Sequence, residues 1–182
     1  MTYELDNDMR EFLIRHKAEL KRDDLNAVYT DILNEFGNAY MPEFTKFFLD
    51  KGINPLKYFN STIPQACFYE IYEIPSIGER LEIKQGTTDI GFSAFLRCNS
   101  IKEVSFPSSL EHIGNKAFYN CMHLEKVYFR SELTSMGSQV FGYCPRLSDI
   151  YVPWSQDSDA DKDFLPLFGI YPDTKIHYNS HK

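Results

Sequence analysis

The sequence lacks a surplus of positive charge. Among its 182 residues, 19 are lysine or arginine and 26 are aspartate or glutamate, which gives a formal net charge of -7 at pH 7. Nucleic-acid-binding proteins need basic side chains to neutralise phosphates, so direct binding of nucleic acid is disfavoured. The chain also has no apolar run near the roughly 20 residues that a membrane-spanning helix requires, and we expect no membrane partner.

Signals for export and for catalysis are also missing. The first eight residues, MTYELDND, lack the apolar core of a signal peptide, so we expect a cytoplasmic protein with reduced cysteines. The 4 cysteines form no Cys-x-x-Cys pair, and the 5 histidines form no metal-binding signature. No phosphate-binding loop, nucleophile motif or dinucleotide-binding motif occurs. These absences predict a non-enzymatic protein with no cofactor and no metal.

What the sequence does contain is a 23-residue repeat. An Ile-Gly pair, an Ala-Phe pair and a cysteine recur at this spacing, each followed by a short alternating apolar stretch. Units of this kind begin at Ile90, Ile113 and Met136, and a degenerate, longer unit begins at Ile63. A single unit of this length cannot bury its apolar face, so the repeat predicts a stacked solenoid.

Each repeat is expected to contribute one short strand to a parallel sheet, such as the stretch from Glu103 to Phe106. A helical or turn segment is expected around each Ala-Phe pair and the cysteine after it. The repeated cysteines fall at an inward position, where they act as small apolar fillers. Gly91, Gly114 and Gly137 recur where the chain either has little room for a side chain or needs a positive φ.

The phrase IGNKAFYNCMHLEKVYF at 113–129 resembles the BspA-type leucine-rich repeat, I-G-x-x-A-F-x-x-C-x-x-L-x-x-I-x-I-P. The resemblance covers residues 63–153 and implies a scaffold for protein recognition. Residues 150–154 and 174–178 are similar to the closing segment of such arrays, in which a loop leads to one last strand. Residues 51–58, together with the first degenerate unit, are similar to the opening segment of short repeat proteins from phages and prophages of Gram-positive bacteria.

The first third of the chain shows helical spacing of its apolar residues instead. Asp23 or Asp24 is a candidate N-cap, Gly37 a candidate helix end, and Pro42 fits the first turn of a third helix. These helices either cover the first repeat or supply a second binding or dimer surface. We therefore predict an α+β solenoid: about four 23-residue leucine-rich repeats with a short parallel sheet, preceded by a three-helix N-terminal cap. The predicted regions are 1–60 (cap), 61–153 (repeats) and 154–182 (C-terminal capping loop and strand).

The outward face of the predicted strands groups charged and aromatic side chains. One column alternates in sign, through Arg80, Glu103, Lys126 and Asp149, which on neighbouring strands stabilises the ladder. The next columns bring tyrosines beside arginine, residue types enriched at binding hot spots. Either these aromatics bind a partner or the 155–169 loop covers them. The candidate partner-binding residues are Lys126, Tyr128, Arg130, Asp149, Tyr151 and Trp154.

The leading hypothesis is a non-enzymatic protein-protein interaction module that binds a protein partner through this face. The alternative is a phage-encoded anti-defence inhibitor, for example of anti-CRISPR type, that masks a basic nucleic-acid-binding host protein in the bacterial cytosol. A hydrolase that uses Cys67 or His112 would need a reactive thiol near a histidine. The acidic run from Asp157 resembles a calcium loop, but Lys162 and Phe168 stand where glycine and glutamate are required, which favours a solvated loop.

Overall fold

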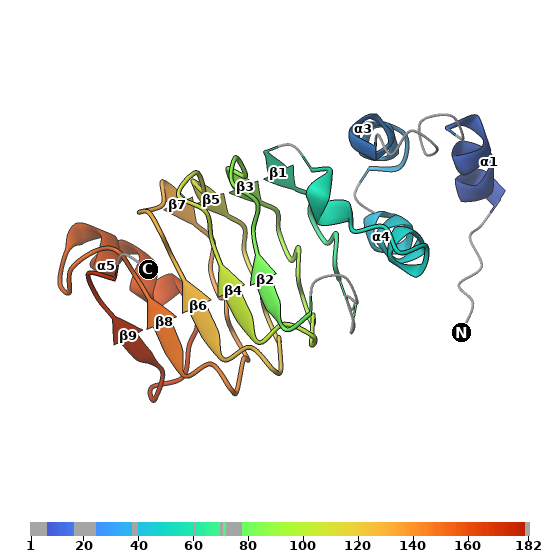
Figure 1. Cartoon of the computed structure of the whole chain (residues 1–182). Coiled ribbons are helices and arrows are strands. Elements are labelled where there is room, and N and C mark those ends of the chain that lie inside the picture. The colour runs from blue at the N-terminus through green and yellow to red at the C-terminus, as the bar shows by residue number, and fades with distance from the viewer. Residues whose placement is uncertain are drawn as a thin grey trace.

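The computed structural model describes residues 7–16, 25–37, 40–59, 61–69, 71 and 78–180. Helices at the N-terminal end lead into a solenoid of stacked coils. The C-terminal segment lies at the opposite end of the solenoid (Figure 1). In the described ranges, no helix is both long and apolar enough to cross a membrane. The predicted N-caps Asp23 and Asp24 lie outside the described residues.

The N-terminal helices are α1 (Asn7–Arg15), α3 (Leu25–Phe36) and α4 (Met41–Asp50). Helix α3 ends before Gly37, whose φ of +63° places it in the left-handed region that terminates many helices. Pro42 lies in the first turn of α4, where its missing N–H costs no hydrogen bond. Both helix boundaries agree with the sequence prediction.

Helix α4 packs on the first coil of the solenoid. The Oγ1 atom of Thr45 lies 3.1 Å from the Sγ atom of Cys67, and both side chains are buried. The short helix η1 (Pro55–Lys57) follows, and the side chain of Asn54 caps it by accepting the N–H of Leu56 at 3.0 Å. Buried apolar residues of the helices and of the repeats form one continuous cluster.

The solenoid has two parallel sheets. The five-stranded sheet has the order β2-β4-β6-β8-β9 and the four-stranded sheet the order β1-β3-β5-β7. The strands of the larger sheet are β2 (Arg80–Glu82), β4 (Glu103–Ser105), β6 (Lys126–Tyr128), β8 (Asp149–Tyr151) and β9 (Lys175–His177). Those of the smaller sheet are β1 (Thr62–Ile63), β3 (Asp89–Ile90), β5 (His112–Ile113) and β7 (Ser135–Met136).

The register confirms the repeat, because Glu103 pairs with Lys126 and Val104 with Val127, each partner being one full period further along the chain. The larger sheet is the predicted one. The smaller sheet was not predicted: its strands have two residues each, too few to show an alternating pattern.

The segment around each Ala-Phe pair is a turn rather than a helix. Ser93 and Arg97 have φ values of +52° and +57°, and the residues at the equivalent positions of the next two repeats also have positive φ. L-residues in the left-handed region interrupt a right-handed helix. Of the two conformations that the sequence left open, the structure has the turn.

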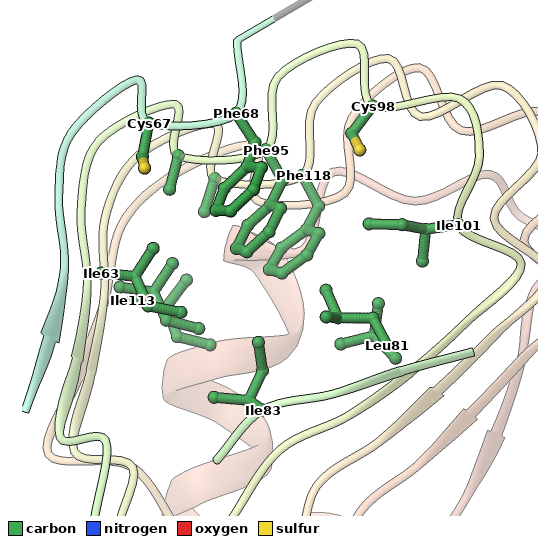
Figure 2. Packing of buried hydrophobic residues seen from close by; sticks show 14 of the residues in the cluster. Ile63, Cys67, Phe68, Leu81, Ile83, Phe95, Cys98, Ile101, Ile113 and Phe118 are labelled. Carbon is green, nitrogen blue, oxygen red and sulfur yellow. The ribbon is translucent and has the colours of Figure 1, made fainter. Parts of the chain in front are cut away.

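Stacked phenylalanines fill the centre of the solenoid (Figure 2). The ring centroids of Phe68 and Phe95 are 4.9 Å apart, and those of Phe95 and Phe118 are 4.7 Å apart. Phe118 lies 5.8 Å from Phe141 in the next coil. The 4 cysteines are free and buried, as the sequence predicted. Cys121 donates its S–H to the carbonyl oxygen of Phe95 at 3.2 Å, a second hydrogen bond to an oxygen that also accepts the N–H of Cys98.

The C-terminal segment closes the other end of the core. Helix α5 (Asp159–Phe164) and the short helix η2 (Leu165–Leu167) precede β9, which pairs in parallel with β8. Phe168 stacks on Phe129 with a centroid distance of 5.7 Å. The acidic run is solvated at Asp157, Asp159 and Asp163, as expected, but it is not a loop. Ser158 caps α5, and Asp161 is buried and accepts the N–H of Asp157 at 3.1 Å.

Candidate functional site

The outward face of the five-stranded sheet carries a column of alternating charge. The register aligns Arg80 with Glu103, Lys126 and Asp149, as predicted, and adds Lys175 from β9. The Nε atom of Arg80 donates to a carboxylate oxygen of Glu103 at 2.8 Å. Neighbouring opposite charges therefore meet on adjacent strands, which stabilises the register of the sheet.

Beside the charges lies an aromatic ladder, formed by Tyr128, Tyr151 and His177. The tyrosine rings stack with centroids 4.7 Å apart and planes 9° apart. The His177 ring continues the stack at 4.3 Å from Tyr151. All three side chains are half-buried, so their ring edges stay accessible from the outward face. Burial also raises the pKa of Tyr128 above its ordinary value.

His177 was missed by the sequence analysis. It lies more than one full period after Tyr151, because the insertion that contains α5 breaks the regular spacing before β9. The His177 Nε2 atom lies 2.7 Å from Oδ1 of Asp149, and Ser148 donates its hydroxyl to Oδ2 at 2.7 Å. These hydrogen bonds, led by that from His177, lower the pKa of Asp149. The ladder and the charge column are thus joined at β8 and β9.

The structure brings five of the six candidate residues to one face. Lys126 and Tyr128 lie on β6, Asp149 and Tyr151 lie on β8, and Arg130 is exposed just after β6.

The sixth candidate, Trp154, lies elsewhere. It is only 3% exposed and packs between Phe129 and Phe164, with centroids 5.9 Å from each. The prediction of Trp154 on this face is corrected, because the chain leaves the sheet after β8 and turns the indole into the core. The helix α5 segment closes the end of the core with buried phenylalanines and leaves the two tyrosines half-exposed.

The geometry gives little support to a hydrolase site at Cys67 or His112, or to a metal site. Burial raises the pKa of the Cys67 and Cys98 thiols to about 12, so neither supplies much thiolate at neutral pH. The Nδ1 atom of His112 lies 2.8 Å from the hydroxyl of Ser135, on the four-stranded sheet. Among the described residues, no group of three or more His, Cys, Asp or Glu side chains could hold a metal ion.

Short parallel strands stacked at a 23-residue period, with ladders of identical residues inside, define a repeat protein of the leucine-rich class. A family model described as "BspA type Leucine rich repeat region" matches residues 61–162 in 6 copies. The chain belongs to this family, as its sequence motif predicted.

Two solved structures are similar to parts of this chain. The pneumococcal vaccine antigen PcpA is 23% identical with a TM-score of 0.52, over 69% of this chain and 32% of its own. The T. pallidum leucine-rich repeat protein TpLRR is 21% identical with a TM-score of 0.46, over 64% of this chain and 44% of its own. The chain thus spans less than half the length of either protein. No curated protein sequence matches it.

Proposed function

We propose that this protein is a non-enzymatic interaction module that binds a protein partner through the outward face of the five-stranded sheet. The observation that supports the proposal is the aromatic ladder, whose stacked rings remain half-exposed beside Lys126 and the exposed Arg130. Aromatic rings and arginine are the side chains that most often dominate the energy of protein interfaces.

The rigidity of the face favours this use. Each ring of the aromatic ladder is held by stacking on its neighbour and by a strand in fixed register. Side chains that are ordered before binding lose little conformational entropy when a partner docks, so a few anchors suffice. Leucine-rich repeats are common scaffolds for protein recognition, which agrees with the proposal. In it, the helices of region 1–60 and the segment 154–182 serve as caps for the two ends of the array.

The experiment is affinity capture from a lysate of a Gram-positive bacterium, at low and at high salt, followed by mass spectrometry. The test variant is Tyr128→Ala/Arg130→Ala/Tyr151→Ala. The matched control is Phe92→Ala/Tyr143→Ala, which removes exposed aromatics from the turns of the solenoid. We expect the wild type and the control to capture the same protein and the test variant to lose it. Retention by the test variant would move the binding surface to another face.

A second candidate function is the anti-defence inhibitor, with which the net charge of -7 is compatible. Such an inhibitor masks a basic nucleic-acid-binding protein, so its complex depends on electrostatic attraction that salt screens. The same capture experiment distinguishes the two candidates. A basic nuclease held at low salt and released at high salt supports the inhibitor. A partner that is retained at high salt supports the general interaction module.

A further inference from the structure

Within the described residues, no strand pairs with the outer edge of β2, which we call its free edge. Strand β2 ends the five-stranded sheet, and β4 is its strand partner in the described part of the chain. Glu103 donates its N–H to the carbonyl of Glu79 at 3.0 Å, and Ile83 donates to the carbonyl of Ser105 at 3.0 Å. Alternate residues of a parallel strand bond to the same neighbour, so Arg80 and Glu82 direct their backbone N–H and C=O groups to the free edge.

A cleft of about 430 Å³ lies along this edge. Leu56 and Lys57 of η1 form one wall, and Arg80, Glu82 and Lys84 line the other. The volume is that of a ligand-sized site. The second wall of the cleft is strand β2 itself. The outward backbone N–H and C=O groups of Arg80 and Glu82 therefore face the cleft.

The charge around the cleft is positive, on a protein whose net charge is negative. Among the described residues that line it, Lys57, Arg80 and Lys84 are basic and Glu82 is acidic, and Arg80 is paired with Glu103 on β4. The Nζ atom of Lys84 lies 3.4 Å from the carbonyl oxygens of Lys57 and Phe59, which holds its charge beside η1. Within the described residues, no carboxylate forms an ion pair with Lys57 or Lys84. Both cations are therefore available to an acidic ligand.

The alternating charge column indicates which charge an added strand would carry beside Arg80. Arg80 begins the column, so a further strand beside β2 would complete the alternation if its residue in register with Arg80 were acidic. The next residue of that strand would point inward, as the buried Leu81 does, toward the apolar part of the cleft at Leu56. A strand in which acidic and aliphatic side chains alternate would therefore match both the cations and the apolar part of the cleft.

We propose that the free edge of β2 binds an extended acidic peptide segment of a protein partner as an added strand. The main chain of the peptide bonds to Arg80 and Glu82, and its carboxylates meet the cations of the cleft. Strand addition of this kind takes affinity from the backbone and specificity from alternate side chains. The site lies at the N-terminal edge of the sheet and is separate from the aromatic ladder, so it stands or falls independently of the proposed function.

The first test uses a fluorescent peptide of about six residues, the usual length of a strand, that alternates aspartate with valine. Binding is measured by fluorescence anisotropy with the full chain. Two further versions carry N-methyl groups on one or the other set of alternate amides. We expect one methylated version to lose binding and the other to keep it, because an added strand uses alternate N–H groups. Equal behaviour of the two versions, or no binding of the unmodified peptide, overturns the proposal. A peptide with lysine in place of aspartate should not bind.

The second test changes the protein. Glu82→Pro removes the N–H that faces the free edge and leaves every bond to β4 intact, a substitution that edge strands tolerate. We expect it to weaken peptide binding about tenfold, whereas Glu82→Ala keeps or improves binding. Lys57→Glu/Lys84→Glu should weaken binding by a similar factor. The controls are Lys175→Glu at the opposite edge of the sheet and the triple variant of the aromatic ladder. An equal loss of peptide binding in either control overturns the assignment of the peptide to the β2 edge. Self-association of the protein through this edge also overturns it.

Discussion

At the scale of single residues, the spacing between coils is maintained by glycine. Gly91, Gly114 and Gly137 are not among the residues with positive φ, so conformational freedom is not the reason for them. A Cβ atom on Gly114 would lie 2.6 Å from the backbone nitrogen of Phe92 in the preceding coil. Of the two reasons that the sequence left open, the close approach of the backbones is therefore the correct one.

Gly114→Ala is expected to destabilise the protein by about 3 kcal/mol, because the obstructing atoms belong to backbone that cannot rotate away. The control is Gly37→Ala, where φ is +63° and nothing lies within 4 Å. That change should cost only about 1 kcal/mol, the strain of a left-handed alanine. Urea unfolding measures both variants. Equal losses would contradict the close-approach explanation.

The Asp149–His177 pair predicts a dependence of stability on pH. The pKa of Asp149 is lowered in the folded state, chiefly by the hydrogen bond from His177. A carboxyl group with a lowered folded pKa stabilises the fold above its unfolded pKa, and this contribution disappears as the pH falls through the folded value.

Asp149→Asn should therefore be less stable than the wild type at neutral pH, by up to about 1 kcal/mol for so accessible a pair. The difference should shrink as the pH falls below about 4, where the wild-type carboxylate takes up its proton. Thermal unfolding across this range measures it. The control is Asp163→Asn, an exposed carboxylate of α5. A loss that does not change with pH would show that the ionised form of Asp149 contributes nothing.

At the scale of elements, helix α4 shields the first coil. Its inner face buries Phe44, Phe48 and Thr45, and Thr45 contacts Cys67 directly. In the part of the N-terminal region that the structure describes, no earlier repeat covers this coil, and α4 takes the place of a neighbouring coil. The exposure of the Cys67 thiol therefore reports on the docking of α4.

Phe48→Ala should destabilise the protein by about 3–4 kcal/mol, the usual cost of truncating a buried phenylalanine. In the native wild type, we expect all 4 cysteines to resist thiol labelling, because each is buried. In the variant, Cys67 should become labelled faster than Cys144 in the fourth repeat. Mass spectrometry of labelled peptides identifies the site. Uniform labelling of the cysteines would indicate that α4 and the solenoid open only together.

At the scale of the whole molecule, the core is a single column that runs from the helices through every coil to α5. In a stacked array, each coil is stabilised only by its neighbours. An interior coil has two neighbours, whereas the last coil has one. The position of a substitution along the column should therefore decide how far its effect spreads.

Phe118→Ala removes a ring that stacks on Phe95 and faces Phe141, at 4.7 and 5.8 Å. We expect a loss of about 4 kcal/mol and lower hydrogen-exchange protection in the coils on both sides. Phe164→Ala in the closing helix should lower protection only near the C-terminal end. Hydrogen exchange monitored by mass spectrometry compares the two variants. Identical exchange patterns would contradict the neighbour-by-neighbour description.

Much of this could be predicted from the sequence, for a physical reason. In a repeat protein the same local interactions occur in every unit, so a residue pattern that recurs in several units is not a chance match. The register between neighbouring strands then follows from adding one 23-residue period to each residue number. The buried cysteines, the tyrosine pair and the alternating charges were all located in this way. The stacking of His177 on the tyrosines and the burial of Trp154 were not predicted, because both residues lie beyond the last complete repeat, where adding one period no longer gives a position.

The sequence by itself therefore determined the solenoid, its parallel register and the composition of its outward face, because each depends on residues at a constant spacing. Only the tertiary structure decided how the array ends. It placed α4 on the first coil, turned Trp154 into the core, added His177 to the aromatic ladder and left the edge of β2 beside a cleft. These features arise from contacts between segments that share no period, and packing alone selects them.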